Sequence, residues 1–167
     1  MSWWGKVIGG ALGFAVSGPI GALLGAAIGH SFDKGLTGIE AMSPEDFSTE
    51  SIQAAFFTAT FSIMGRVAKS DGIVSQEEIE VAQATMSRMQ LNDEQTKAAQ
   101  KLFSQGKEAS FDYRAVAEQL RKECGRRTNL LQMFLEIQIA TALADGELHE
   151  TEQVILRELA ELLGFKR

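Results

Sequence analysis

The stretch from residue 7 to residue 29 constrains the fold of this chain most strongly, because it contains no charged side chain. As a helix rising about 1.5 Å per residue, it would be about 35 Å long, more than the roughly 30 Å hydrocarbon core of a bilayer. Trp3 and Trp4 stand just before it, where indole rings favour the lipid–water boundary, and Lys6 can extend to the same boundary. The sequence therefore predicts a transmembrane helix over residues 7–29, preceded by a short tail at residues 1–6.

Small residues recur at every fourth position along this stretch. Glycine costs about 1 kcal/mol relative to alanine at a helical position, so a stripe of glycines needs another reason. In lipid, helices gain little by hiding apolar surface, and close backbone approach becomes the main attraction. We therefore predict a glycine zipper, at which two copies of the helix form a homodimer. Its residues are Gly5, Gly9, Gly13, Ser17, Gly21, Gly25 and Gly29.

Two alternatives to a single span stay open. A hairpin turning at residues 17–19 would have arms of about 16 Å, too short to cross a bilayer, whereas a kink at Pro19 is tolerated in a membrane helix. A cleaved secretory signal is the other alternative, but the stretch is longer than a usual signal and lacks a convincing cleavage site. Orientation is not decided by charge, because Lys6 lies on one side and Lys34 on the other.

After the predicted span, residues 30–50 are predicted to be a linker, since they mix glycine, proline, serine and acidic residues without sustained periodicity. Within this linker, Ser43 and Pro44 can start a short helical turn, with serine as the cap and proline at the first helical position.

From residue 51 to residue 167, apolar residues recur at helical spacing and no alternating strand pattern occurs. This pattern predicts an all-α bundle. The segment 128–144 is apolar on nearly every side, so we expect it to be the central helix. The predicted helices are 51–70, 75–90, 93–105, 113–124, 128–144 and 149–163.

An internal repeat organises this bundle. AKSDGIVSQEEIEVA (68–82) and ALADGELHETEQVIL (142–156) superpose, and each joins an apolar helix to an amphipathic one through an Asp-Gly turn. Duplication predicts that the two halves pack about a pseudo-twofold axis.

The turns of the repeat have two interpretations. In the first copy, Ser75 and Glu78 form a capping box, but His149 in the second copy is a poorer cap. Alternatively, acidic residues seven apart across each turn supply hard oxygen ligands for a divalent cation, although neither copy has the dense acidic array of an EF-hand. The candidate metal ligands are Asp71, Glu78, Asp145 and Glu152.

The charge distribution excludes some partners. The formal net charge is −6, which argues against binding to duplex nucleic acid, since that rests on a basic stripe facing the phosphates. One local basic cluster is interpreted as a solvated helix end, or else as a contact for anionic lipid or a partner. It consists of Arg121, Lys122, Arg126 and Arg127.

Catalytic motifs are not found in the sequence. Serine nucleophile motifs, a phosphate-binding glycine loop after a strand and clustered histidines are all absent, so we expect no enzyme. Cys124, the single cysteine, excludes an internal disulfide and lies at apolar spacing typical of a buried core thiol. His149 is expected to be an exposed residue at a helix start. Glu136 and Gln138 are expected to make structural hydrogen bonds, because buried polar groups need partners.

Several motifs resemble one family. They are WGKVIGGALG (4–13), GHSFDK (29–34), SDGIVSQEEI (70–79) and FLEIQIATALADGELHETE (134–152). Together they are similar to the membrane-anchored DnaJ-like co-chaperones, which have a glycine-rich N-terminal anchor, a tellurite-resistance-B-like (TerB-like) helical domain and a C-terminal J domain. The similarity spans nearly the whole chain, and it implies a TerB-like domain at residues 51–167.

The resemblance also implies a location and a partner. The anchor would cross the bacterial inner membrane once and dimerise there, with the N-terminus outside and the helical domain in the cytoplasm. The family acts on an Hsp70-type chaperone through a His-Pro-Asp tripeptide in the J domain, and no such tripeptide occurs in these 167 residues. This chain is thus expected to be either a relative without that module or the front part of a longer protein.

The function that follows is a membrane-anchored TerB-like interaction domain, the anchoring or regulatory part of a DnaJ-like co-chaperone system in envelope-stress signalling. The alternative is a membrane-tethered domain for divalent metal binding or metal stress, as in tellurite resistance. A divalent cation is the one cofactor that the sequence suggests.

Overall fold

The computed structural model describes three residues near the N-terminus, 20, 22 and 23, and most of the chain from 44 to 165. The ranges in that second part are 44–70, 74–89, 91, 93–125, 127–144, 146 and 148–165. Its helices are α4 (Pro44–Lys69), α5 (Gln76–Arg88), α6 (Asp93–Gly106), α7 (Tyr113–Cys124), α8 (Thr128–Ala142) and α9 (Glu150–Leu162). No strand occurs in these ranges, so the predicted all-α class is confirmed for them.

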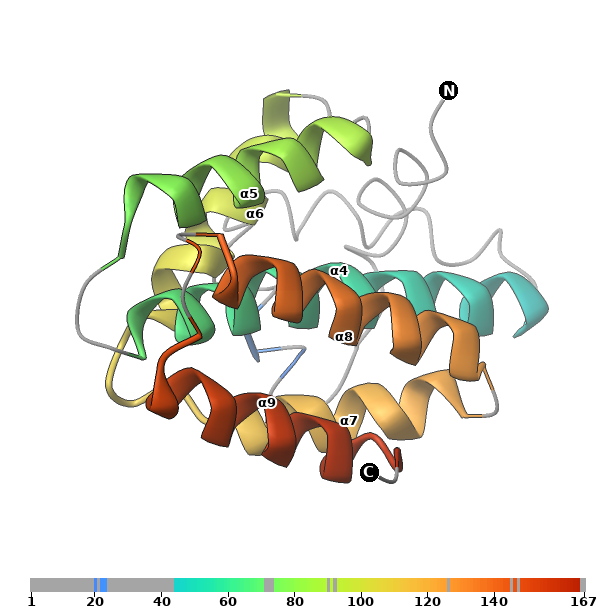
Figure 1. Cartoon of the computed structure of the whole chain (residues 1–167). Coiled ribbons are helices and arrows are strands. Elements are labelled where there is room, and N and C mark those ends of the chain that lie inside the picture. Colours follow the sequence, from blue (N-terminus) through green and yellow to red (C-terminus); the bar gives the residue numbers. More distant parts are fainter. Residues whose placement is uncertain are drawn as a thin grey trace.

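Helix α4 is the centre of the bundle. It crosses the middle of the molecule behind α8, with α5 above it and α7 and α9 below it (Figure 1), and α6, α7 and α8 all pack against it. Every residue of α4 from Ala55 to Gly65 is buried, so the helix is covered on all sides over three turns. The helix begins at Pro44, as the Ser-Pro pair suggested, rather than at residue 51.

The prediction that the segment 128–144 is the central helix is wrong, for a physical reason. Helix α4 carries Thr58, Thr60 and Ser62, which make its sequence look half polar, yet all three are fully buried. Small hydroxyl side chains can bond to the carbonyl one turn back and so hide their polarity. Ser62 Oγ does this, donating to the Thr58 carbonyl oxygen at 2.7 Å.

Two glycines bring α4 and α6 into backbone contact. A Cβ atom at Gly65 would lie 2.0 Å from the carbonyl oxygen of Phe103, and one at Gly106 would lie 1.7 Å from that of Ser62. Real Cβ atoms essentially never come within 3.0 Å of such atoms. The crossing therefore requires glycine on both helices.

Little of the predicted transmembrane helix lies among the described residues. Ile20 is fully buried in the bundle, and its backbone N–H donates to Gln119 Oε1 on α7 at 2.9 Å. Leu23 packs against the same core. Among the residues that the structure describes, no helix combines the length and the apolar character needed to cross a membrane. The tail at 1–6, the seven zipper positions and the linker up to residue 43 lie outside the described residues.

Candidate interaction surface

Helix α8 buries one face and exposes the other. Leu131, Phe134 and Gln138 point into the bundle and are buried. At about 100° per residue, the exposed positions from Asn129 onward fall within one arc of about 120° around the helix, with Glu136 near its middle. The exposed residues are Thr128 at the helix start, then Asn129, Gln132, Met133, Glu136, Ile139 and Ala140, followed by Leu143 just after the helix.

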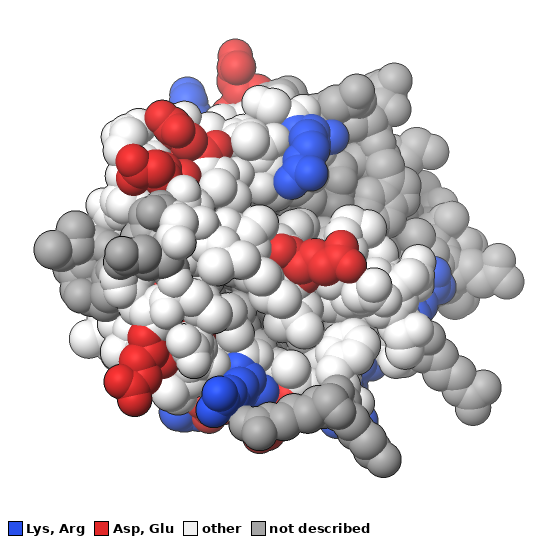
Figure 2. Space-filling model, in the orientation of Figure 1, with Lys and Arg blue, Asp and Glu red and all other residues white. Residues whose placement is uncertain are grey.

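Large apolar side chains remain exposed on α8, on α9 and in the loop between them. Among the described residues, the exposed large hydrophobics are Met133 (46 %), Ile139 (38 %), Leu143 (46 %), Leu148 (38 %) and Val154 (55 %). All of them belong to α8, to α9 or to the loop between these helices, and we call them the apolar face. Figure 2 shows mainly uncharged side chains across the middle of the molecule, where α8 lies in Figure 1. Apolar side chains that gather in this way often mark interaction sites.

The surroundings of the apolar face are mainly acidic. Glu136 is the one charged residue of α8, and its Oε1 accepts a hydrogen bond from Gln132 Nε2 at 3.0 Å. Helices α4, α5, α7 and α9 all pack against α8. Helix α5 contains three glutamates and one arginine, and α9 contains four glutamates and one arginine, whereas α7 contains two glutamates and three basic residues. The formal charge beside α8 is therefore negative on α5 and α9 and positive at the start of α8, where Arg121, Lys122 and Arg127 lie.

The two polar residues predicted on this helix have different surroundings. Gln138 is fully buried and donates from Nε2 to the Thr60 carbonyl oxygen at 3.1 Å, so its predicted structural role is confirmed. Glu136 is exposed rather than buried. The spacing of Asn129, Gln132 and Glu136, three and four residues apart, is the sequence signal that could have revealed the solvent-facing side.

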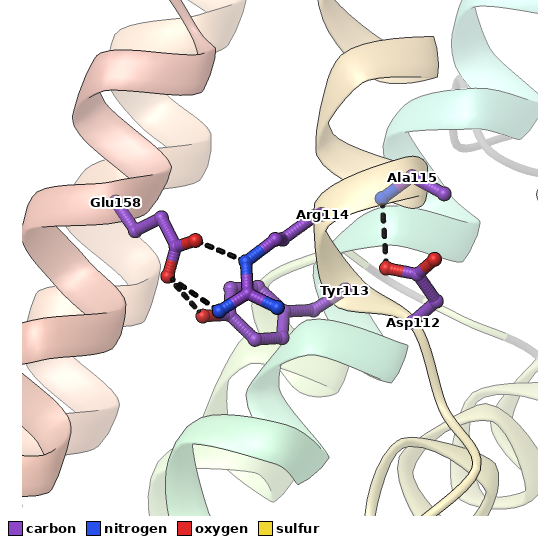
Figure 3. Close-up of polar contacts among 5 residues, drawn as sticks. All are labelled: Asp112, Tyr113, Arg114, Ala115 and Glu158. Carbon is purple, nitrogen blue, oxygen red and sulfur yellow. Dashed lines mark hydrogen bonds and ion pairs between the residues drawn. The ribbon is translucent and has the colours of Figure 1, made fainter.

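A polar cluster that no local sequence pattern predicts fixes α9 against α7. Glu158 of α9 receives hydrogen bonds from the Tyr113 hydroxyl and from Arg114 Nε (Figure 3). A further bond joins Arg114 Nη2 to Glu158 Oε2 at 3.2 Å. Burial, together with the Glu158 carboxylate, raises the pKa of Tyr113 to about 12, and the Arg114 hydrogen bond lowers the pKa of Glu158. The cluster holds α9, and with it Val154, in place.

The two repeats have the same local geometry at the start of their second helices. Ser75 and His149 are both N-cap residues with extended backbones. Glu78 Oε1 accepts from the Ser75 N–H at 2.9 Å, and Glu152 Oε1 accepts from the His149 N–H at 3.1 Å. Both carboxylates thus contribute to capping, despite the different cap residues. His149, expected to be exposed, is half-buried.

The metal prediction is only partly covered by the structure. Glu78 and Glu152 are buried, whereas Asp71 and Asp145 lie outside the described residues. Within the part of the chain that is described, no group of three or more His, Cys, Asp or Glu residues could hold a metal ion. The four-carboxylate site stays a prediction.

The basic cluster lies where α7 ends and α8 begins. Arg121 and Lys122 are exposed in the last turn of α7, where positive charge favours the helix dipole. Arg127 is the exposed N-cap residue of α8, and Arg126 lies outside the described residues. A contact of this cluster with lipid or a partner stays a prediction.

Cys124 is buried at the end of α7, which confirms the predicted core thiol. Burial raises its pKa to about 11. The thiol is therefore protonated at neutral pH and is a poor nucleophile.

Comparison with known proteins identifies the family. Residues 57–167 match the model of the tellurite resistance protein TerB. The chain belongs to the TerB family. The TerB match covers α5 to α9 and the second half of α4. A second model, the co-chaperone DjlA transmembrane domain, matches residues 1–39, so a DjlA-type membrane domain precedes the TerB domain.

Relatives of the whole chain join the TerB domain to the same membrane domain. The chain is 43% identical to the co-chaperone protein DjlA of Photobacterium profundum, over 97% of this chain and 61% of the relative. It is 40% identical to DjlA of Escherichia coli, over 100% of this chain and 61% of the relative. The DjlA of Legionella pneumophila is 42% identical, over 87% of this chain and 50% of the relative. The chain thus spans only about half to three fifths of these relatives.

These matches confirm the resemblance to membrane-anchored DnaJ-like co-chaperones with a TerB-like domain. The relatives are named as co-chaperones, not as enzymes. No solved structure matches the chain.

Proposed function

We propose that this chain anchors a DjlA-type co-chaperone to the bacterial inner membrane and presents its TerB domain as an interaction module rather than as an enzyme. The observation that carries the proposal is the order of the two matched domains in one chain, a DjlA transmembrane domain at residues 1–39 and TerB at 57–167. The relatives that share both segments are named co-chaperones.

The proposed topology is a single span with a short outer N-terminus and a cytoplasmic TerB domain. The uncharged stretch at residues 7–29 and the tryptophans before it support the span. This topology requires Ile20 and Leu23 to lie in lipid instead of against the bundle, where the structure describes them. Small residues at every fourth position support a homodimer, since they allow two backbones to approach closely in lipid. Within the TerB domain, the matched N-cap geometry of α5 and α9 supports a duplicated unit with pseudo-twofold symmetry.

The proposed partner is an Hsp70-type chaperone, engaged in envelope-stress signalling. In the family, that engagement belongs to a J domain, whose His-Pro-Asp tripeptide these 167 residues do not contain. The role proposed for this part is to hold the co-chaperone at the membrane as a dimer and to bring partners to it.

Extraction and crosslinking test the anchor. Alkaline carbonate washing of membranes should leave the full chain in the pellet, and crosslinking should capture a dimer. Gly9→Leu with Gly13→Leu should lower the crosslinked fraction by about tenfold, because bulky side chains separate the helices. Ala11→Leu, about 200° away from Gly9 around the helix, is the matched control and should leave the dimer intact. Release into the supernatant, or an equal loss of dimer in the control, contradicts the proposal.

A pulldown tests the partner and the metal alternative together. Hsp70-type chaperones should be recovered with the chain fused to the J domain of a DnaJ-like co-chaperone, equally with EDTA or with added calcium or magnesium. Calorimetric titration of the chain with calcium, magnesium and zinc should show no heat. A cation-dependent recovery or a clear binding isotherm would instead favour the site at Asp71, Glu78, Asp145 and Glu152.

A further inference from the structure

We propose that the apolar face binds an amphipathic helix of a partner protein whose polar positions carry lysine or arginine. The inference rests on the proposed function only in assuming that the TerB domain recruits a partner. Its own support is the exposure, spacing and charge of the residues on α8 and α9.

The spacing of the exposed residues fits a helical partner. The exposed strip of α8 runs from Asn129 to Leu143, which is about 21 Å at helical rise. Met133, Ile139 and Leu143 lie along the strip and are between a third and a half exposed. A helix lying along α8 would cover these side chains with its own apolar residues at three- and four-residue spacing, which is how an amphipathic helix packs onto an apolar surface.

The charge around the apolar face selects a basic partner. Glu136 lies near the middle of the exposed arc, and the neighbouring helices α5 and α9 each carry an excess of glutamate. Lysine or arginine at the polar positions of the bound helix would therefore meet acidic side chains. Such complementarity raises association rates and rejects acidic partners.

The same charges disfavour two other occupants. In a symmetric dimer through α8, each patch meets its own copy, so Glu136 would approach a second Glu136 and the acidic α9 would approach its own twin. Like charges placed opposite each other cost binding energy. An anionic membrane surface lying along the strip would also be repelled by Glu136, since anionic lipid attracts basic rather than acidic segments. The basic residues Arg121, Lys122 and Arg127 lie only at the start of α8.

Peptide binding to the full chain tests this inference. The chain is reconstituted in phosphatidylcholine nanodiscs, and empty discs give the background. Two fluorescent synthetic helices of about five turns share the same leucine positions and differ only in having lysine or glutamate elsewhere. Fluorescence anisotropy is expected to show that the lysine peptide binds at least about tenfold more tightly than the glutamate peptide, with an affinity that falls as salt increases.

Substitutions locate the binding. Glu136→Arg and Ile139→Ser are each expected to weaken the lysine peptide by about tenfold. Glu118→Arg, the same charge reversal at an exposed position of α7, is the control and should change the affinity by less than about twofold. Each variant should have the same melting temperature as the parent chain, because all three residues are exposed.

Three results would overturn the inference. They are equal binding of the two peptides, an affinity unaffected by Glu136→Arg, and crosslinking of two copies through Leu143→Cys in the absence of peptide. The last result would assign the face to a second copy of the chain. Because the assay contains no Hsp70, its failure leaves the proposed anchor and chaperone role standing, and carbonate extraction tests that role separately.

Discussion

Replacement of Gly65 or Gly106 by alanine should destabilise the bundle, although alanine is the better helix former. In an ordinary helix the change would gain about 1 kcal/mol. Here the new Cβ would lie 2.0 Å from the Phe103 carbonyl oxygen, or 1.7 Å from the Ser62 carbonyl oxygen. Both obstacles are backbone atoms, which no side-chain rotation can move. Whether the substitution raises or lowers the free energy of unfolding therefore depends on the free energy needed to separate α4 from α6.

The required separation is large for a packed core. Reaching 3.0 Å, the closest approach that Cβ atoms tolerate, needs about 1 Å of movement. A gap of that size loses a quarter to a half of the dispersion energy across the contact, and overpacked cores lose about 1–3 kcal/mol or more. After the gain in helix propensity of about 1 kcal/mol, we expect a net loss of roughly 1–2 kcal/mol for each substitution. For a domain of this size this corresponds to a melting temperature about 4–8 °C lower.

Thermal and urea unfolding of the full chain, followed by far-UV circular dichroism, measures the effect. Ser104→Ala, at an exposed position of α6, is the control and should change stability by less than about 0.5 kcal/mol. Because Gly65 and Gly106 share one crossing, the double variant should lose less than the sum of the two single losses. An unchanged or higher melting temperature for Gly106→Ala would refute the argument from backbone contact.

Three further predictions concern buried polar groups. Tyr113→Phe should lower the free energy of unfolding by about 1 kcal/mol. Folding raises the pKa of Tyr113 from 10.0 to about 12. In urea unfolding at several pH values, the parent chain should therefore lose stability as the pH rises from 10 towards 12, and the variant should not. Thr60→Val should stabilise the fold by about 1 kcal/mol in the same assay, since the Thr60 hydroxyl is buried without a partner; a loss of stability would contradict this. Burial raises the pKa of Cys124 to about 11. The thiol should therefore react with maleimide at neutral pH at least about tenfold more slowly in the native chain than in the urea-unfolded chain. Equal rates would show that the thiol is accessible in the native chain.

The helices could be predicted from the sequence because their signals are local. Apolar residues at three- and four-residue spacing indicate where each helix lies, and the Ser75–Glu78 capping box marks the start of α5 within a residue. Asp112 similarly caps α7, accepting from the Ala115 N–H at 3.2 Å (Figure 3). Capping side chains bond to backbone groups only a few residues away, so they can be recognised in the sequence without tertiary information.

The arrangement of the helices could not be predicted in the same way. The average hydrophobicity of a helix does not show how many of its faces are covered, so α8 looked more deeply buried than α4. Thr58, Thr60 and Ser62 make the sequence of α4 look half polar, yet all three are buried in the bundle, and the Ser62 hydroxyl bonds to a carbonyl of its own helix. The contact of Tyr113 and Arg114 with Glu158 joins residues more than forty positions apart, and no local pattern predicts such a pair.

The position of α4 has a mechanical consequence. A force applied to the chain at Pro44, where α4 begins, travels along the axis of the innermost helix of the bundle. At Gly65 and Gly106 that force passes directly from one main chain to another, with no deformable side chains between them. Such a pull is therefore shared between α4 and α6 at once, instead of peeling away a peripheral helix.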